Sequence, residues 1–248
     1  MNFKENFKPK AHTPPKGLFN SIRFNLRLLI DLQVVSVYRH VKLFLKGASG
    51  NLLDLGCGES PYHFLVKNKP IKYFGVDITE ASNFDYQRTD ITHFDGQKIP
   101  FPDNYFDNII CTEVLEHVEN YQALVDDVFR VLKPNGQALF TVPWSARYHY
   151  IPYDYFRYTP STLNKIFSQY REREIISRGT DITSISAKII VLFFRNIFPI
   201  KLWAYIFFPF WLAISPLIFL TIIFGQISLL TKFGSDLDPI GYTILIKK

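Results

Sequence analysis

Hydrophobic and polar positions along the chain alternate between helical and strand periods. From Leu18 to about Lys46 apolar residues recur at helical spacing, which predicts one helix that ends at Gly47. Alternating strand-like and helix-like segments follow, the pattern of a parallel sheet covered on both faces. The predicted strands are 51–55, 72–77, 86–89, 107–111, 137–142, 173–178 and 241–246, and the predicted helices are 119–132 and 159–170.

One long apolar segment does not fit this alternation. Residues 202–231 contain no charged side chain, and as a single helix they would be about 45 Å long, more than the ~30 Å hydrocarbon core requires. A break near Pro216 gives two helices too short to span a bilayer. We therefore expect residues 183–232 to form a re-entrant or monotopic membrane hairpin that begins with an amphipathic helix at about 185–198. The alternative is a hydrophobic lid or dimer face buried by protein.

Charge is concentrated at the N-terminus. The net charge is +6, and residues 1–50 hold nine Lys or Arg against two acids. A basic arm suits an anionic surface, either lipid headgroups or nucleic acid, and the apolar segment favours lipid. The two cysteines form no disulfide framework and have no metal-ligand spacing, so no metal site is expected. No apolar signal segment follows Met1. These features predict a bacterial protein at the cytoplasmic face of a membrane.

The first predicted strand runs into a glycine loop. Gly56 and Gly58 allow the backbone to turn sharply and to approach a ligand closely. Asp54 stands two residues before the first glycine. Its negative charge would repel a nucleotide phosphate and favour a cationic ligand, such as one that carries an ammonium and a sulfonium group.

Acids also follow the next two predicted strands. Asp77, with Ile78 beside it, lies 21 residues after Gly56, about the spacing at which a Rossmann-like second strand delivers a carboxylate to ribose hydroxyls. Asp90 is expected to end the third strand and to accept a hydrogen bond from an adenine amino group, while Ile91 covers the ring.

These motifs resemble the class I S-adenosylmethionine-dependent methyltransferases, in particular the group that includes ubiquinone and menaquinone biosynthesis methyltransferases. The resemblance covers about residues 50–144 and rests on five segments in order: Leu53-Asp54-Leu55-Gly56-Cys57-Gly58, the acid Asp77, Ile99–Asp107, Cys111–Val118 and Val131–Gly136. The family's third glycine is Ser60 here, which leaves the local loop geometry open.

The resemblance implies S-adenosylmethionine as the cofactor and assigns roles to several residues. Asp54, Gly56 and Gly58 would line its methionine end, Asp77 would hold the ribose, and Glu113 would lie over the cofactor. No Asn-Pro-Pro-Tyr or Asp-Pro-Pro-Tyr signature of amino methylation follows the fourth strand, where Thr112 and Glu113 stand, so nucleic acid is disfavoured as the substrate.

The loop after the fifth predicted strand must shape the acceptor site. It resembles loops of relatives in bacterial surface-glycan and lipid pathways. His149 is the candidate general base for an acceptor hydroxyl, oriented by Asp154. The expected substrate-binding residues are Trp144, Tyr148, Tyr153 and Arg157. Alternatively, an Asp154–Arg157 pair braces the loop and His149 only packs.

Together these features predict an α/β fold: a Rossmann-like, doubly wound, seven-stranded sheet with an antiparallel last strand and a hydrophobic helical insertion before it. Residues 1–46 would form the basic arm and N-terminal helix, 47–182 with 233–248 the methyltransferase domain, and 183–232 the insertion. The expected activity is O-methylation of a lipid-linked or amphiphilic acceptor, such as a surface-glycan or quinone precursor. An inactive cofactor-binding membrane scaffold and a methyltransferase of a soluble small molecule remain alternatives.

Overall fold

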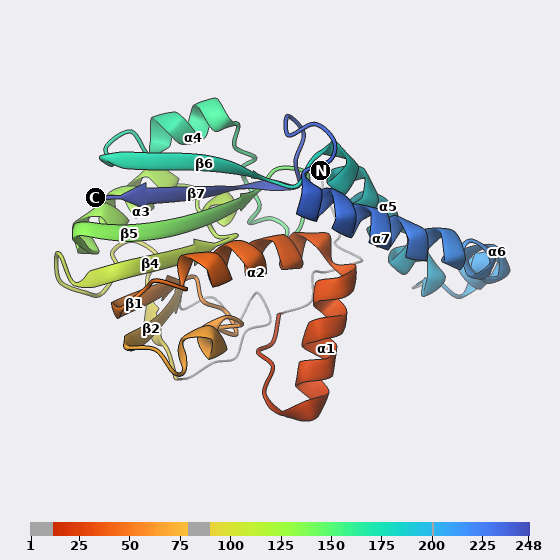
Figure 1. Ribbon diagram of the computed structural model, residues 1–248, viewed down its shortest axis with the longest axis horizontal. Coiled ribbons are helices and arrows are strands. Elements are labelled where there is room, and N and C mark those ends of the chain that lie inside the picture. The colour runs from red at the N-terminus through yellow and green to blue at the C-terminus, as the bar shows by residue number, and fades with distance from the viewer. Residues whose placement is uncertain (1–11, 79–89, 200) are drawn as a thin grey trace.

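A mixed sheet forms the centre of the protein. The computed structural model describes residues 12–78, 90–199 and 201–248, and in this part of the chain seven strands join in the order β3-β2-β1-β4-β5-β7-β6 (Figure 1). The strands are β1 Gly50–Leu55, β2 Ile71–Ile78, β3 Thr92–Phe94, β4 Phe106–Thr112, β5 Leu132–Pro143, β6 Glu172–Arg178 and β7 Gly241–Lys247. β7 pairs antiparallel with both β5 and β6, and the other pairs are parallel. The predicted fold class is confirmed.

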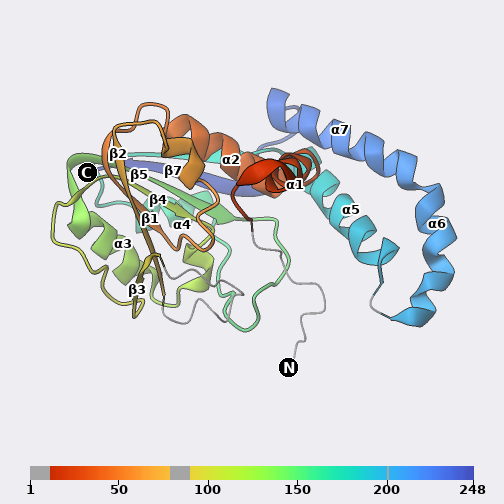
Figure 2. The same cartoon turned by 90° about the horizontal axis from the view of Figure 1, so that it is seen from below.

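Side chains that alternate along the strands build a separate core on each face of the sheet. Leu52 packs in a cluster with Val41 of α2 (Leu32–Phe44), whereas its neighbour Leu53 belongs to the cluster that includes Val125 of α3 (Tyr121–Val131). Figure 2 shows these two helices on opposite faces of the sheet. α4 (Pro160–Ile166) packs on the same face of the sheet as α3. Because both faces are covered, the edge formed by the carboxyl ends of the parallel strands remains available for a site.

The single N-terminal helix predicted from Leu18 to Lys46 is wrong. Two helices, α1 (Gly17–Ile30) and α2, meet at Asp31, whose backbone is extended with ψ 95°. The Asp31 carboxylate accepts a hydrogen bond from the N–H of Val34 and caps α2. The free N–H groups in the first turn of α2 need an acceptor, and the short Asp31 side chain provides one. The chain therefore starts a new helix at this point although the apolar periodicity continues through it.

Residues 133–136, between the predicted helix 119–132 and the predicted strand 137–142, belong to β5. The pairing of β5 with β4 shifts from Phe106 opposite Leu132 to Asn108 opposite Gln137. Asn135, inside this interval, has a left-handed φ of 62°. The segment therefore bends the start of the strand and does not form a separate loop.

Residues 183–232, predicted as the hydrophobic insertion, lie in a helical hairpin that leads away from the sheet (Figure 1). Its elements are α5 (Asp181–Ile197), the short 3-10 turn η4 (Leu202–Phe207), α6 (Phe208–Ala213) and α7 (Ser215–Thr231). α7 starts beside Pro216, the residue at which a break is predicted.

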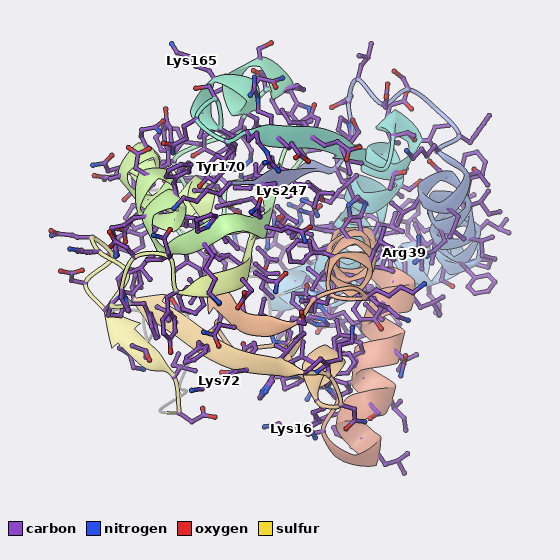
Figure 3. All side chains as sticks on the ribbon, turned by 60° about the vertical axis from the view of Figure 1, so that its left-hand side comes forward. Lys16, Arg39, Lys72, Lys165, Tyr170 and Lys247 are labelled. Carbon is purple, nitrogen blue, oxygen red and sulfur yellow. The ribbon has the colours of Figure 1, made fainter. Side chains whose placement is uncertain are left out.

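The hairpin is anchored at its base. A Cβ on Gly225 of α7 would lie 2.6 Å from Leu32 of α2, so the two helices approach closely. Arg39, labelled in Figure 3, donates from α2 to Gln226 of α7 at 3.3 Å. The Ser228 hydroxyl lies 2.8 Å from that of Thr180, the N-cap of α5. Among the described helices, none is both long and apolar enough to cross a bilayer alone, and α5 with residues 202–213 would qualify only as a pair bent by 115°.

Candidate functional site

A cleft of about 2430 Å³ lies at the carboxyl ends of the central strands. Its floor includes Leu55 at the end of β1, Asp77 in β2 and Glu113 directly after β4. Its walls extend to residues of α1 and α5. The predicted cofactor loop, the acceptor loop and the base of the helical hairpin therefore share one continuous space.

The glycine loop has the predicted backbone. Gly56 and Gly58 have φ values of +68° and +48°, which L side chains rarely adopt. A Cβ on Gly56 would overlap the Val114 side chain. Both glycines line the cleft. Residues 56–58 therefore form a cradle in which backbone atoms face the space that a ligand would occupy.

Asp77 ties this loop to β2. Its Oδ2 accepts a hydrogen bond from the N–H of Gly58 at 2.7 Å, and its Oδ1 accepts one from Ile78 at 2.8 Å. Burial raises the pKa of Asp77, opposed by these two backbone N–H donors. A carboxylate has about four acceptor positions, so two remain for the hydroxyls of a ligand. Asp77 and Ile78 both line the cleft, where the sequence places them.

Asp54 is buried directly before the glycine loop. Its side chain is 2% exposed and is not among the described residues that line the cleft. The Tyr73 hydroxyl donates to Asp54 Oδ2 at 2.6 Å. Asp54 therefore contributes negative potential and packing next to the glycine loop, and its contact with the methionine end of the cofactor stays a prediction.

The contact of Asp90 and Ile91 with an adenine ring stays a prediction. The predicted strand 86–89 is outside the described residues, and β3 begins at Thr92, so Asp90 and Ile91 precede this strand and do not end it. Neither is among the described lining residues, whereas Asp95 and Gly96, directly after β3, are. Asp95 Oδ1 accepts a hydrogen bond from the N–H of Gln97 at 2.9 Å. An acid followed by glycine at a strand end is the signal that could have located this position.

Glu113 lines the cleft, but its carboxylate is already engaged. Oε1 accepts a hydrogen bond from Arg178 at 2.6 Å, and Oε2 accepts one from Gln33 at 2.6 Å. The residue has a strained φ of +55°, held by the bond from its N–H to Thr141 at 3.0 Å. Glu113 thus connects β4 to α2 and β6, and no local sequence pattern predicts these partners.

Arg178 is fully buried at the end of β6. Besides Glu113 it donates to the carbonyl of Val142 at 2.9 Å and to the hydroxyl of Ser36 at 3.1 Å. A Cβ on Gly241 of β7 would overlap the guanidinium, so glycine there makes room for Arg178. This buried cation fixes the floor of the cleft from below.

His149 and Asp154 come together as predicted from the loop sequence. His149 Nδ1 lies 2.9 Å from Asp154 Oδ2, and the His149 backbone N–H donates to the same oxygen at 3.0 Å. Asp154 also pairs with Arg157 at 2.6 Å, which is the bracing interaction considered as an alternative. Hydrogen bonds from Arg157 and His149 hold the pKa of Asp154 well below its usual range, against the opposing effect of burial. His149 lines the cleft and the other two do not, so Asp154 orients the imidazole from behind.

Glu116 and His117 lie next to this pair; Glu116 was not predicted as a site residue, and the sequence leaves a packing role and a ligand contact equally open for His117. Burial, with a contribution from the charge of Glu113, raises the pKa of Glu116 well above its usual value. Burial lowers the pKa of His117 to about 4. The rings of His117 and His149 meet edge to face with centroids 5.0 Å apart. Two imidazoles and a buried carboxyl therefore meet at one wall of the cleft.

The predicted substrate-binding residues separate into two groups. Trp144 lines the cleft and donates to Asp238 at 2.9 Å. Tyr148, Tyr153 and Arg157 are not among the described lining residues, and the two tyrosines are exposed. Other members of the same loop take those places: Arg147, Tyr150 and Tyr155. Composition identified the loop, but its path decides which side chains face inward.

Known proteins resemble this chain in the region of the cleft. A family model described as a methyltransferase domain matches residues 53–140. The chain is 32% identical over 100 residues to a Mycolicibacterium smegmatis protein named a probable S-adenosylmethionine-dependent methyltransferase, and this match covers 39% of each chain. It is 25% identical over 174 residues to the demethylmenaquinone methyltransferase of Listeria monocytogenes, which covers 64% of this chain and 73% of the relative.

A solved structure extends the likeness to the fold. A structure of an S-adenosylmethionine-dependent methyltransferase from Archaeoglobus fulgidus aligns with a TM-score of 0.54 at 19% identity, covering 91% of this chain and 99% of that one. The match to the mycobacterial protein, by contrast, spans about two fifths of that relative's length.

Proposed function

We propose that this chain, whose residues 53–140 match a family model described as a methyltransferase domain, transfers a methyl group from S-adenosylmethionine to a hydroxyl of an amphiphilic, lipid-linked acceptor at a membrane surface. One observation carries the proposal: a single cleft joins the glycine loop at residues 56–58 to helices α1 and α5, which line it with both apolar and basic side chains. Surface-glycan and quinone precursors are both acceptors of this kind.

The residues at the strand ends fit the cofactor. The backbone cradle at Gly56 would hold the amino acid end, Asp77 offers two acceptor positions for the ribose, and Asp95 stands where the adenine would follow. When bound, S-adenosylmethionine supplies an electrophilic methyl group, and its sulfur leaves as a neutral thioether as the acceptor oxygen bonds to carbon. The protein's own task is to align and activate the acceptor.

His149 is the residue proposed to activate the acceptor hydroxyl. Its Nδ1 faces Asp154, so the neutral ring carries its lone pair on Nε2. Direct acceptance of the hydroxyl proton by Nε2 is the simplest form of this activation. Asp154 acts as a positioning residue because Arg157 and His149 hold it in one orientation.

Asp77→Ala tests the cofactor site. Removal of the carboxylate is expected to weaken S-adenosylmethionine binding by about 100-fold, because hydrogen bonds to a charged group contribute about 1.5–3 kcal/mol each. Asp77→Asn keeps one acceptor oxygen and should lose less. Calorimetric titration measures both, and unchanged affinity in Asp77→Ala would remove the proposed ribose contact.

The walls of the cleft favour an amphiphile. Ile189 and Leu192 of α5 are exposed apolar residues that line it, and Lys188 and Arg195 of the same helix line it too. Apolar and cationic groups on one helix match a lipid tail beside an anionic headgroup.

The surface of the hairpin supports a membrane location. Large apolar side chains on one continuous segment remain exposed, more than a soluble surface usually shows: Leu202, Trp203, Ile206, Phe207, Phe210, Leu212, Leu217, Phe219, Leu220 and Leu230. Lys201 and Lys232 flank this uncharged stretch. An anionic bilayer would bury the apolar side chains in its hydrocarbon region and attract the flanking lysines to its headgroups.

Transfer of a labelled methyl group tests the function. Full-length protein is incubated with methyl-labelled S-adenosylmethionine and a bacterial lipid extract, and label is expected in a lipid product. Label only in the water-soluble fraction would favour a soluble acceptor. Tight cofactor binding without any labelled product would favour a scaffold that has lost catalysis.

A double substitution tests the membrane surface. Trp203→Asp with Ile206→Asp is expected to weaken binding to anionic phospholipid vesicles on the order of 100-fold, since each buried side chain contributes about 1.5–3 kcal/mol. Leu43→Asp is the matched control, because Leu43 is equally exposed but lies at the far end of α2. Vesicle flotation gives the comparison, and equal loss in both proteins would argue against a hairpin-specific contact.

A further inference from the structure

Three side chains at the acceptor wall form a compact group of ligands. Glu116, His117 and His149 each place one carboxylate oxygen or ring nitrogen within 4.8 Å of the others. The two histidines line the cleft directly. His149 lies 32 residues after His117, so local spacing in the sequence gives no sign of the group.

Glu116 points to a missing cationic partner. Its side chain is 0% exposed, and neither carboxylate oxygen receives a hydrogen bond from the described part of the chain. His117 Nε2 stands 3.7 Å from Oε1, beyond hydrogen-bond distance. Buried polar groups in folded proteins almost always have partners, and burying an acid without one is costly.

The two imidazoles are held as metal ligands usually are. His117 Nδ1 lies 2.7 Å from the carbonyl of Tyr153, and His149 Nδ1 lies near both Asp154 Oδ2 and the carbonyl of Arg147. A neutral ring that donates from Nδ1 carries its lone pair on Nε2. A carbonyl or carboxylate that accepts from the other nitrogen is the outer contact that orients histidine toward a metal.

We propose that Glu116, His117 and His149 bind one divalent transition-metal ion with a coordination position open to the cleft. Two histidines and one carboxylate are a ligand set for zinc or non-haem iron, both with positions left for substrate. Ligand atoms that bind zinc tetrahedrally at about 2.0–2.1 Å lie about 3.4 Å from one another. The three side chains must therefore move modestly closer together around the ion.

This inference rests on the proposed function and refines how His149 acts. The Nε2 lone pair of His149 holds the ion, and the ion polarises the acceptor hydroxyl in place of direct proton acceptance by the ring. The O–H bond breaks and its proton passes to water in the open cleft, and the oxygen then forms the new bond to the methyl carbon.

Metal titration without cofactor or acceptor tests the site by itself. Full-length protein stripped with chelator and titrated with Zn²⁺ is expected to bind one equivalent, and Co²⁺ should give a visible ligand-field spectrum. Glu116→Gln and His117→Ala should each weaken Zn²⁺ binding by at least about 100-fold. His93→Ala, which removes an exposed histidine from β3, should leave the affinity unchanged.

The outcomes separate the two proposals. No stoichiometric Zn²⁺ binding by the wild type, or binding that survives both substitutions, overturns the metal site. If Glu116→Gln does not fold, His117→Ala and the cobalt spectrum decide in its place. Metal binding with no labelled product from any extract keeps the site and rejects the proposed transferase function. Labelled product from chelator-treated protein at the full rate keeps the function and rejects the role of the ion.

Discussion

His149→Ala is expected to reduce methyl transfer to a hydroxyl acceptor by about 10²- to 10⁴-fold, the range in which loss of a positioned acid–base group usually falls. The cause is local, because His149 reaches the cleft and Asp154 fixes its ring at 2.9 Å. S-adenosylmethionine affinity should stay within about twofold, since the cradle at Gly56 and Asp77 is on different elements. Transfer assays and calorimetry on the same preparation separate the two effects.

The matched control for this variant is Tyr148→Ala. Tyr148 is the immediate neighbour of His149, is exposed, and is not among the described lining residues. Transfer by this control should remain within about threefold of the wild type. Full turnover by His149→Ala would reject His149 as the activating residue, and an equal loss in Tyr148→Ala would assign the effect to loop order.

The cofactor side of the site follows closely from the sequence because its determinants are local. The glycine loop with Gly56 and Gly58 directly follows β1, and Asp77 lies near the end of β2. These two strands are parallel neighbours, so their spacing in the sequence predicts that both features reach the same edge of the sheet. The antiparallel β7 between β5 and β6 follows from the family resemblance, and the structure confirms it. Asp95 was not predicted as a lining residue, because the position of β3 depends on which short segment pairs with β2, and alternation alone did not decide this.

The acceptor side depends on contacts between residues far apart in the chain. Glu113 finds Gln33 and Arg178, which are 80 and 65 residues away. His149 meets His117 only because the loop after β5 packs against the 3-10 turn at residues 115–117, which follows β4. Periodicity and local motifs carry no information on such pairings, so sequence reasoning could identify the aromatic loop but not which members face the cleft. The two N-terminal helices show the same limit, since one capping side chain at Asp31 redirects an unbroken apolar pattern.

The Arg178 contacts give the largest expected effect on stability. Arg178→Met keeps the packing volume but removes the charge that faces Glu113 and leaves the acceptors at Val142 and Ser36 without their donor. Loss of one partner of a buried pair costs about 3–5 kcal/mol in the free energy of unfolding. Urea unfolding should show a loss of that size in the free energy of unfolding extrapolated to water, with a lower midpoint concentration.

Two companion variants decide whether the ion pair is the cause. Arg173→Met changes an exposed arginine on the same strand and should alter the free energy of unfolding by less than about 0.5 kcal/mol. Glu113→Gln combined with Arg178→Met should be less destabilised than the sum of the single variants, because both then lack the charge that needs a partner. If Arg178→Met costs less than about 1 kcal/mol, or if the two substitutions add without coupling, the buried cation does not hold β4, α2 and β6 together, and the floor of the cleft is stabilised by its apolar core alone.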